Sequence, residues 1–174
     1  PIQKTRLDMK IIDNFLPDYQ FKQIQSIFLG DSFPWYYSER IVNDDEDGYD
    51  PKDYFFVHGI LRYGITSNYY QVLRNSSLFA LLGVNEFERI KVNLNPRTLF
   101  NKSSGWHVDY EANSEVKNTA VYYLNTCNGY TKFKKGGKVK SVENRIVIFD
   151  SSLKHAGYTC TDQKIRVVMN LNWI

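Results

Sequence analysis

Apolar residues recur at helical spacing in two segments of the first half of the chain. Between Pro17 and Gly30 they fall three or four residues apart, at Phe21, Ile24, Ile27 and Phe28. Proline is tolerated in the first turn of a helix and glycine is common just past its end, so this spacing predicts one amphipathic helix over residues 17–30. The same spacing over residues 69–82, followed by Gly83, predicts a second helix.

Short runs of alternating apolar and polar residues, typical of β-strands, dominate the second half of the chain. One strand is expected before them, over residues 54–63, which are rich in aromatic and branched side chains. The later strands are predicted over residues 89–95, 119–124, 130–133, 138–142, 145–149 and 165–173, with a hairpin turn at 135–137. Helices followed by such a series predict a mainly β fold with supporting helices, either a sandwich or an open barrel.

The last predicted strand places polar residues in a buried environment. Side chains alternate along a strand, so Val167, Met169, Leu171 and Trp173 point one way. The other face carries Arg166, Val168, Asn170 and Asn172. An arginine on a largely buried strand needs an anion to offset the cost of burying its charge.

No repeat, low-complexity tract or linker divides the 174 residues, so we expect a single domain over residues 1–174. Residues 1–88 would supply helical support, a lid loop and a strand, and residues 89–174 the β core. The lid is expected within residues 31–53, which contain Pro34, Gly48, Pro51 and an acidic stretch. That stretch, residues 43–53, could close over a substrate and select a basic peptide or amine.

Composition narrows the class of protein. A hydrophobic content of 43% with 24% charged residues excludes a disordered, collagen-like or coiled-coil chain. A net charge of +3 is too small to argue for nucleic-acid binding by itself, although residues 132–145 are rich in lysine. No apolar run approaches a membrane span and no apolar signal core begins the chain, so we expect an intracellular, cytoplasmic protein. Cys127 and Cys160 are expected to be buried free thiols.

Two of the three histidines fall in the β region and define a candidate metal site. His107 and Asp109 stand two residues apart, and positions i and i+2 of an extended segment share a face. With His155 from a distant segment they supply three ligands on one side of a metal. This facial triad suits non-haem Fe(II), whose open positions accept further ligands, and the same residues also suit zinc. Arg166 on the same interior would bind the far carboxylate of a metal-bound dicarboxylate.

Taken together, these motifs resemble the Fe(II)/2-oxoglutarate-dependent dioxygenases, and within them the prolyl 4-hydroxylase-like branch. The resemblance covers roughly residues 89–174, with a looser likeness at residues 13–17. It rests on five motifs: His107-Val108-Asp109, Val121-Tyr122-Tyr123-Leu124-Asn125, residues 137–149, His155-Ala156-Gly157 and Arg166. It implies a double-stranded β-helix, also called a jelly roll, with a cupin-like core.

The resemblance also implies roles for individual residues. His107, Asp109 and His155 match the iron ligands, and Arg166 matches the residue that pairs with the distal carboxylate of 2-oxoglutarate. Tyr122 matches a tyrosine that supports this carboxylate. Asn95 falls where relatives often place a polar group that touches the cosubstrate, although Tyr is common there, and Asn93 is its neighbour on the same face. The sequence departs from the pattern at Val168, where many relatives have Ser or Thr.

The activity implied is hydroxylation of an unactivated C–H bond with Fe(II), 2-oxoglutarate and O2, releasing succinate and CO2. A prolyl or other peptide residue of a protein is the expected target. Alternatives are a small-molecule substrate, demethylation of a nucleic acid, or a cupin-type metal hydrolase or binding module that uses the same three ligands. Because Asp109 is present, halogenation is not expected: related halogenases lack this carboxylate.

Overall fold

The computed structural model describes residues 9–39 and 53–174. The helices are α1 (Asp18–Phe28), α2 (Tyr70–Arg74) and α3 (Leu78–Leu82). The strands are β1 (Lys10–Ile12), β2 (Tyr36–Ser38), β3 (Phe55–Arg62), β4 (Ile65–Thr66), β5 (Arg89–Pro96), β6 (Asn118–Tyr123), β7 (Tyr130–Phe133), β8 (Gly137–Lys140), β9 (Arg145–Asp150), β10 (His155–Tyr158) and β11 (Ile165–Trp173). Most of the predicted acidic lid lies outside the described residues. Its last residue, Asp53, forms an ion pair with Lys102.

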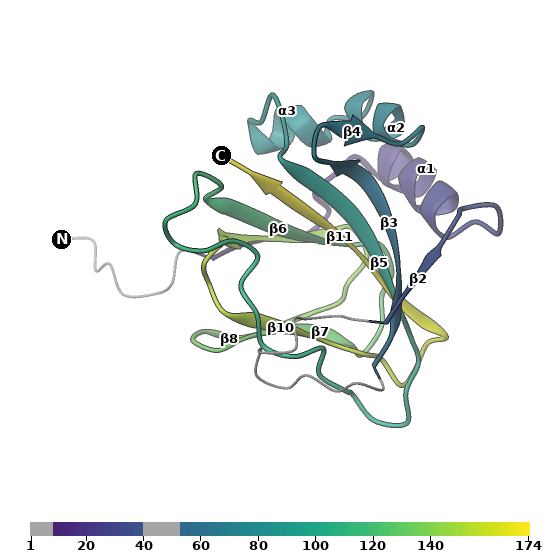
Figure 1. Ribbon diagram of the computed structural model, residues 1–174. Coiled ribbons are helices and arrows are strands. Elements are labelled where there is room, and N and C mark those ends of the chain that lie inside the picture. The colour runs from purple at the N-terminus through teal and green to yellow at the C-terminus, as the bar shows by residue number, and fades with distance from the viewer. Residues whose placement is uncertain (1–8, 40–52) are drawn as a thin grey trace.

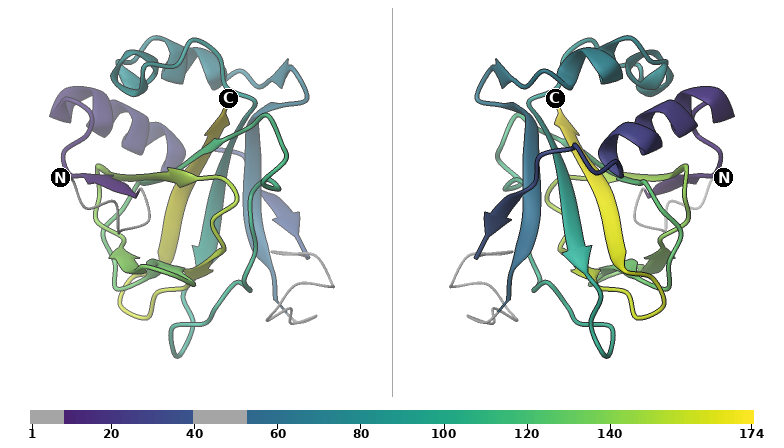
Figure 2. Two further views of the ribbon diagram at one scale, coloured as in Figure 1. Left: turned by 90° about the vertical axis from the view of Figure 1, so that its left-hand side faces the viewer. Right: turned by 90° about the vertical axis from the view of Figure 1, so that its right-hand side faces the viewer.

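The strands form two antiparallel sheets that face each other. The large sheet has the order β1-β9-β6-β11-β5-β3-β2, with β4 paired to β3, and the small sheet has the order β10-β7-β8. The three helices cover the outer side of the large sheet, and the small sheet lies on its opposite side (Figure 1). The side views in Figure 2 show the same layers. This arrangement confirms the predicted jelly-roll core with supporting helices.

The predicted strands of the second half are all present, and several other elements differ from expectation. β1, β2, β4 and β10 were not predicted as strands. β2 lies within the range expected for the lid loop and pairs with β3, and β10 pairs with β7. The helix predicted over residues 69–82 is split into α2 and α3. The Ser76 hydroxyl donates a hydrogen bond to the Leu73 carbonyl (2.7 Å) and accepts one from the Leu78 amide (3.2 Å), so it replaces helical bonds at the break. Gly83, with φ 68°, ends α3 as predicted.

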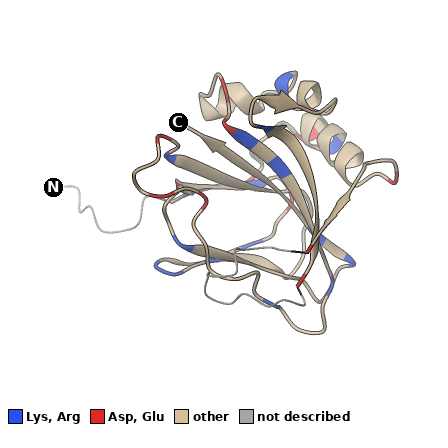
Figure 3. Ribbon diagram, in the orientation of Figure 1, with Lys and Arg blue, Asp and Glu red and all other residues tan. Residues whose placement is uncertain are grey.

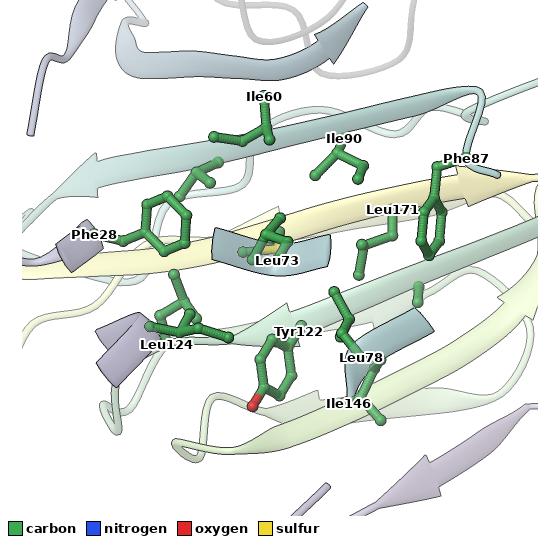
Figure 4. Packing of buried hydrophobic residues seen from close by; sticks show 14 of the residues in the cluster. Phe28, Ile60, Leu73, Leu78, Phe87, Ile90, Tyr122, Leu124, Ile146 and Leu171 are labelled. Atoms are coloured by element: carbon green, nitrogen blue, oxygen red, sulfur yellow. The ribbon is translucent and has the colours of Figure 1, made fainter. Parts of the chain in front are cut away.

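The main hydrophobic core lies between the helices and the large sheet. Figure 4 shows Phe28, Leu73 and Leu78 of the helices against Ile90 and Leu171 of the sheet. Val167 and Met169 join this core, so the face of β11 that these residues were predicted to share is the one that packs beneath the helices. His58 also serves the fold, because its Nδ1 lies 2.8 Å from the Pro34 carbonyl and its ring packs on Phe33. No helix within the described residues is long and apolar enough to cross a membrane.

Asn144 fastens the segment before α1 to the sheet. Its side chain donates to the Leu16 carbonyl (2.8 Å) and accepts from the Leu16 amide (2.9 Å) and from the Tyr122 hydroxyl (2.7 Å). The residue is buried and has a φ of 59°, a left-handed conformation that asparagine tolerates better than most residues. This position therefore requires both the amide group and the backbone conformation of asparagine.

We expect Asn144→Ala to lower the free energy of unfolding by about 3 kcal/mol, because it leaves buried partners unpaired and strains the left-handed backbone. For a chain of this size the melting temperature would fall by roughly 6–12 °C, measurable by circular dichroism. Asn85→Ala, at an exposed position, is the control and should change little. Equal melting temperatures for the two variants would contradict this account of the residue.

Candidate metal centre

The backbone brings the two candidate histidine ligands together. The His107 amide donates to the His155 carbonyl (3.0 Å), and the His155 amide donates back to the His107 carbonyl (2.9 Å). The ring centroids lie 4.5 Å apart. Asp109 is set by its own amide, which donates to the Ser151 carbonyl (3.1 Å). The ligand atoms of His107, Asp109 and His155 all lie within 4.8 Å of one another, so the structure assembles the predicted triad.

Hydrogen bonds at Nδ1 of both histidines leave Nε2 as the nitrogen available to a metal. Nδ1 of His107 lies 3.2 Å from the Gly105 carbonyl, and Nδ1 of His155 lies 2.9 Å from the Leu153 carbonyl. A carbonyl only accepts hydrogen bonds, so each Nδ1 carries the proton and each Nε2 keeps its lone pair. Burial, together with neighbouring His155, lowers the pKa of His107 to about 4, so this imidazole is neutral at pH 7 as a ligand must be.

Asp109 is held by a small polar network. Arg89 donates from Nη2 to one carboxylate oxygen (3.0 Å), and the Asn172 amide donates to the other (3.2 Å). Arg89 Nε also donates to the Asn172 Oδ1 (2.9 Å), which fixes the two partners relative to each other. Burial would raise the pKa of Asp109, but the histidines, Arg89 and Lys91 outweigh it and hold this pKa well below its ordinary value. The carboxylate is therefore ionised and oriented.

A cavity beside the triad, which we call the inner pocket, is built from alternate residues of the two central strands. His107 and His155 line it. So do Lys91, Asn93 and Asn95 of β5, and Arg166, Val168 and Asn170 of β11. The structure thus brings the predicted residues Asn93, Asn95 and Arg166 to the metal ligands.

Arg166 is 2% exposed and has no acidic partner among the residues that the structure describes. Its Nε donates to the Ser141 hydroxyl (2.8 Å) and its Nη2 to the Thr131 hydroxyl (3.1 Å). Gly129 packs directly against the Arg166 side chain. A Cβ at this position would come within 2.6 Å of the Arg166 Cδ and 2.9 Å of the Tyr158 carbonyl, so a larger residue would displace the arginine. A buried guanidinium held only by neutral hydroxyls fits an anionic ligand that enters the pocket.

The structure corrects the prediction for Tyr122. Tyr122 lies in the core on the helix side, among Leu124, Leu78 and Ile146, as Figure 4 shows, and its hydroxyl bonds to Asn144. The next residue, Tyr123, faces Arg166, whose guanidinium lies 5.7 Å from its ring centroid. The Tyr123 hydroxyl donates to Thr131 (2.9 Å), one of the groups that hold Arg166. Hydroxyls near Arg166 thus come from Thr131, Ser141 and Tyr123, which accounts for the apolar residue at position 168.

Sequence reasoning assigned no role to several residues of the site. Arg89 and Asn172 hold the carboxylate ligand, and Lys91 and Asn170 line the inner pocket. The alternation of side chains along β5 and β11 could have identified them as residues that face the site. Asn170 and Asn172 share the face of Arg166, and Lys91 shares the face of Asn93. A second cavity, the outer pocket, adjoins the first and is lined by Asp109, Arg62, Tyr63, Arg89 and Tyr110, while Phe55 and Lys91 line both pockets.

No protein-family model matches the sequence, and no curated protein matches it. Solved structures do match. A prolyl hydroxylase from Trichoplax adhaerens, in complex with a peptide of the hypoxia-inducible factor, has a TM-score of 0.63 and 16% identity, with 95% of this chain and 83% of that chain covered. A prolyl-4-hydroxylase from Pseudomonas putida has a TM-score of 0.59 and 16% identity, covering 94% and 91%. The α-ketoglutarate-dependent non-haem epimerase SnoN of nogalamycin biosynthesis has a TM-score of 0.68 and 10% identity, covering 97% and 78%. The fold is therefore that of the 2-oxoglutarate/Fe(II) oxygenases.

We expect Asn172→Ala to weaken metal binding by about 10-fold or more, because partners that orient a ligand are worth 10- to 100-fold in metal affinity. The substitution is neutral, so it removes orientation without changing the charge at the site. Anaerobic calorimetry with Mn(II) measures the effect. Asn118→Ala, at the start of β6, is the matched control. Unchanged Mn(II) affinity in a folded Asn172→Ala protein would show that Asp109 needs no such support.

Proposed function

We propose that the chain is a single-domain Fe(II)- and 2-oxoglutarate-dependent dioxygenase that hydroxylates an unactivated C–H bond. One observation carries this proposal. Three ligands of the facial-triad type lie within 4.8 Å of one another, and a buried arginine without an acidic partner among the described residues lines the same pocket as two of these ligands, His107 and His155. Two histidines and one carboxylate leave open metal positions, and the arginine supplies the partner for a dicarboxylate cosubstrate.

In this proposal the protein positions the reactants. His107, Asp109 and His155 would hold the metal, which together with 2-oxoglutarate and O2 supplies the oxidising chemistry. Arg166 binds the distal carboxylate and so fixes the direction in which the cosubstrate lies. Val121 and Val168 line the inner pocket with apolar surface, which limits water around the reacting groups.

We propose a peptide, with a prolyl side chain as the first candidate, as the substrate. The Trichoplax adhaerens enzyme of the same fold is a prolyl hydroxylase in complex with a peptide, which supports this class of substrate. The outer pocket is the place for it, because this cavity reaches Asp109 and continues toward the surface along β3. Tyr63, which is 80% exposed, and Tyr110 offer ring faces on which a proline can pack.

The cofactor assignment predicts a visible charge-transfer band when the apoprotein is titrated anaerobically with Fe(II) and then 2-oxoglutarate. Asp109→Ala should abolish the band because a metal ligand is lost. Arg166→Met should raise the 2-oxoglutarate concentration at half-saturation by about 10-fold or more, as expected for a lost charged hydrogen bond. Bound iron without a band in the wild type would overturn the proposal and favour a metal hydrolase.

The two adjacent tyrosines provide a matched pair of variants for the same titration. Tyr123→Phe removes a hydroxyl that supports Thr131 beside Arg166, so we expect about 3- to 10-fold weaker 2-oxoglutarate binding. Tyr122→Phe, on the opposite face, should lower the melting temperature and leave the affinity unchanged. The reverse pattern would restore the original assignment of Tyr122.

The substrate assignment predicts that proline-containing peptides stimulate the conversion of 2-oxoglutarate to succinate, with a mass increase of one oxygen on the peptide. A peptide library measured by succinate release and mass spectrometry tests it. The control library replaces each proline by alanine. Stimulation by free small molecules alone, with no peptide modified, would sink the peptide hypothesis while leaving the cofactor assignment in place.

A further inference from the structure

Lys91 stands at the junction of the two pockets and is one of the residues that line both. It lies on β5, on the face that carries Asn93 and Asn95, and its direct neighbour across the sheet is Asn170 of β11. Figure 3 shows the basic residues of β5 as blue segments of this strand. Its charge acts on His107 and Asp109, so the ammonium group lies within electrostatic reach of the metal ligands.

In the described part of the chain, this lysine and the side-chain oxygens of two neighbouring asparagines have no partners. Within residues 9–39 and 53–174, the Lys91 ammonium makes no hydrogen bond or ion pair. The Oδ1 atoms of Asn93 and Asn170 are buried and also have no hydrogen-bond partner there. Buried polar atoms are satisfied in the great majority of cases, and unpaired ones in a cavity indicate a ligand or bound water. These two buried oxygens and the partly buried Lys91 ammonium line one cavity and form a polar cluster that a ligand can complete.

The other charged groups around this wall are already accounted for. Arg89 pairs with Asp109 at 3.0 Å, and Arg166 at the far end of the inner pocket is set for the distal carboxylate. Arg62 lies at the rim of the outer pocket, over the ring of Tyr63 at 4.9 Å, and does not line the inner pocket. Among the described residues that line the two pockets, Lys91 is therefore the cation that remains for a second anionic group near the metal.

The spacing of β11 indicates which anionic group this is. Asn172, which contacts Asp109, shares one face of β11 with Asn170 and Arg166. Asn170 lies two residues before Asn172 in the sequence, and Arg166 lies four residues before Asn170. Each step of two residues spans roughly 7 Å, so Asn170 and its neighbour Lys91 stand near the metal end of the strand and Arg166 at the other. A 2-oxo acid chelates a metal through its keto oxygen and the adjacent carboxylate, and this carboxylate would lie at the Lys91 end.

We propose that Lys91, supported by Asn170 and Asn93, binds the carboxylate adjacent to the keto group of the cosubstrate. This inference rests on the proposed function. The Lys91 ammonium would donate to this carboxylate, and the side-chain oxygens of Asn93 and Asn170 would accept its remaining protons. The two ends of the cosubstrate are then recognised separately, by Lys91 at the metal end and by Arg166 at the distal end.

The test compares two 2-oxo acids in the anaerobic Fe(II) titration. Pyruvate has the carboxylate next to the keto group and lacks the distal one. Lys91→Met should weaken the binding of both 2-oxoglutarate and pyruvate by a similar factor of about 10-fold or more. Arg166→Met should weaken 2-oxoglutarate binding only. Lys91→Arg keeps the charge and should recover part of the affinity for both acids.

Two controls separate this role from a structural one. Arg62→Met removes a nearby charge outside the inner pocket and should leave both affinities unchanged. Lys91→Met removes an unpaired, partly buried charge, so its melting temperature should equal or exceed that of the wild type. If Lys91→Met binds both acids as the wild type does, or loses affinity for 2-oxoglutarate alone, the inference is wrong while the proposed function stands. A wild type without a band would overturn the proposed function itself.

Discussion

The strict alternation of side chains along β11 is the constraint on which the site depends. This strand lies in the middle of the large sheet, paired with β5 and β6 along most of its length. One of its faces completes the core beneath the helices, and the other carries the groups that hold Asp109 and line the inner pocket. A slip of one residue in either pairing would exchange the two faces. Stability and the candidate site are therefore fixed by the same register.

The need to compensate buried charges explains most of the other contacts in the site. A charge taken out of water must be paired or hydrogen-bonded, and Asp109 meets this requirement through Arg89 and Asn172. Arg166 meets it only in part, through two neutral hydroxyls, and Lys91 has no such partner in the described part of the chain. A bound metal adds positive charge beside these groups. An anionic ligand with a carboxylate at each end would offset the charge at both ends of the pocket, which neutral substrates alone would not do.

The sequence predicted the triad because its signals are local and chemical: His107 and Asp109 share a face by spacing, and His155 follows an apolar strand. Tyr122 was assigned wrongly because β6 is buried on both faces, so its apolar sequence carries no polarity contrast to show which side meets the helices. Only the pairing of Met169 with Tyr122 decides this. Arg89 and Lys91 were missed for a different reason: alternation places them on the face of Asn93, but their role depends on which strand lies beside β5. The break between α2 and α3 depends on one serine hydroxyl within a helical pattern.

The two pockets draw on different parts of the chain. The triad, Arg166 and most of the inner pocket come from residues after Arg89, whereas the outer pocket takes much of its wall from β3 and the residues that follow it. The similar solved structures share the fold at 10–16% identity and include both prolyl hydroxylases and an epimerase. Under the proposed function, binding of the metal and of a 2-oxo acid needs few residues, namely the triad and the charged groups of the inner pocket. Specificity would then be set by side chains such as Tyr63 and Tyr110, which lie outside the hydrophobic core.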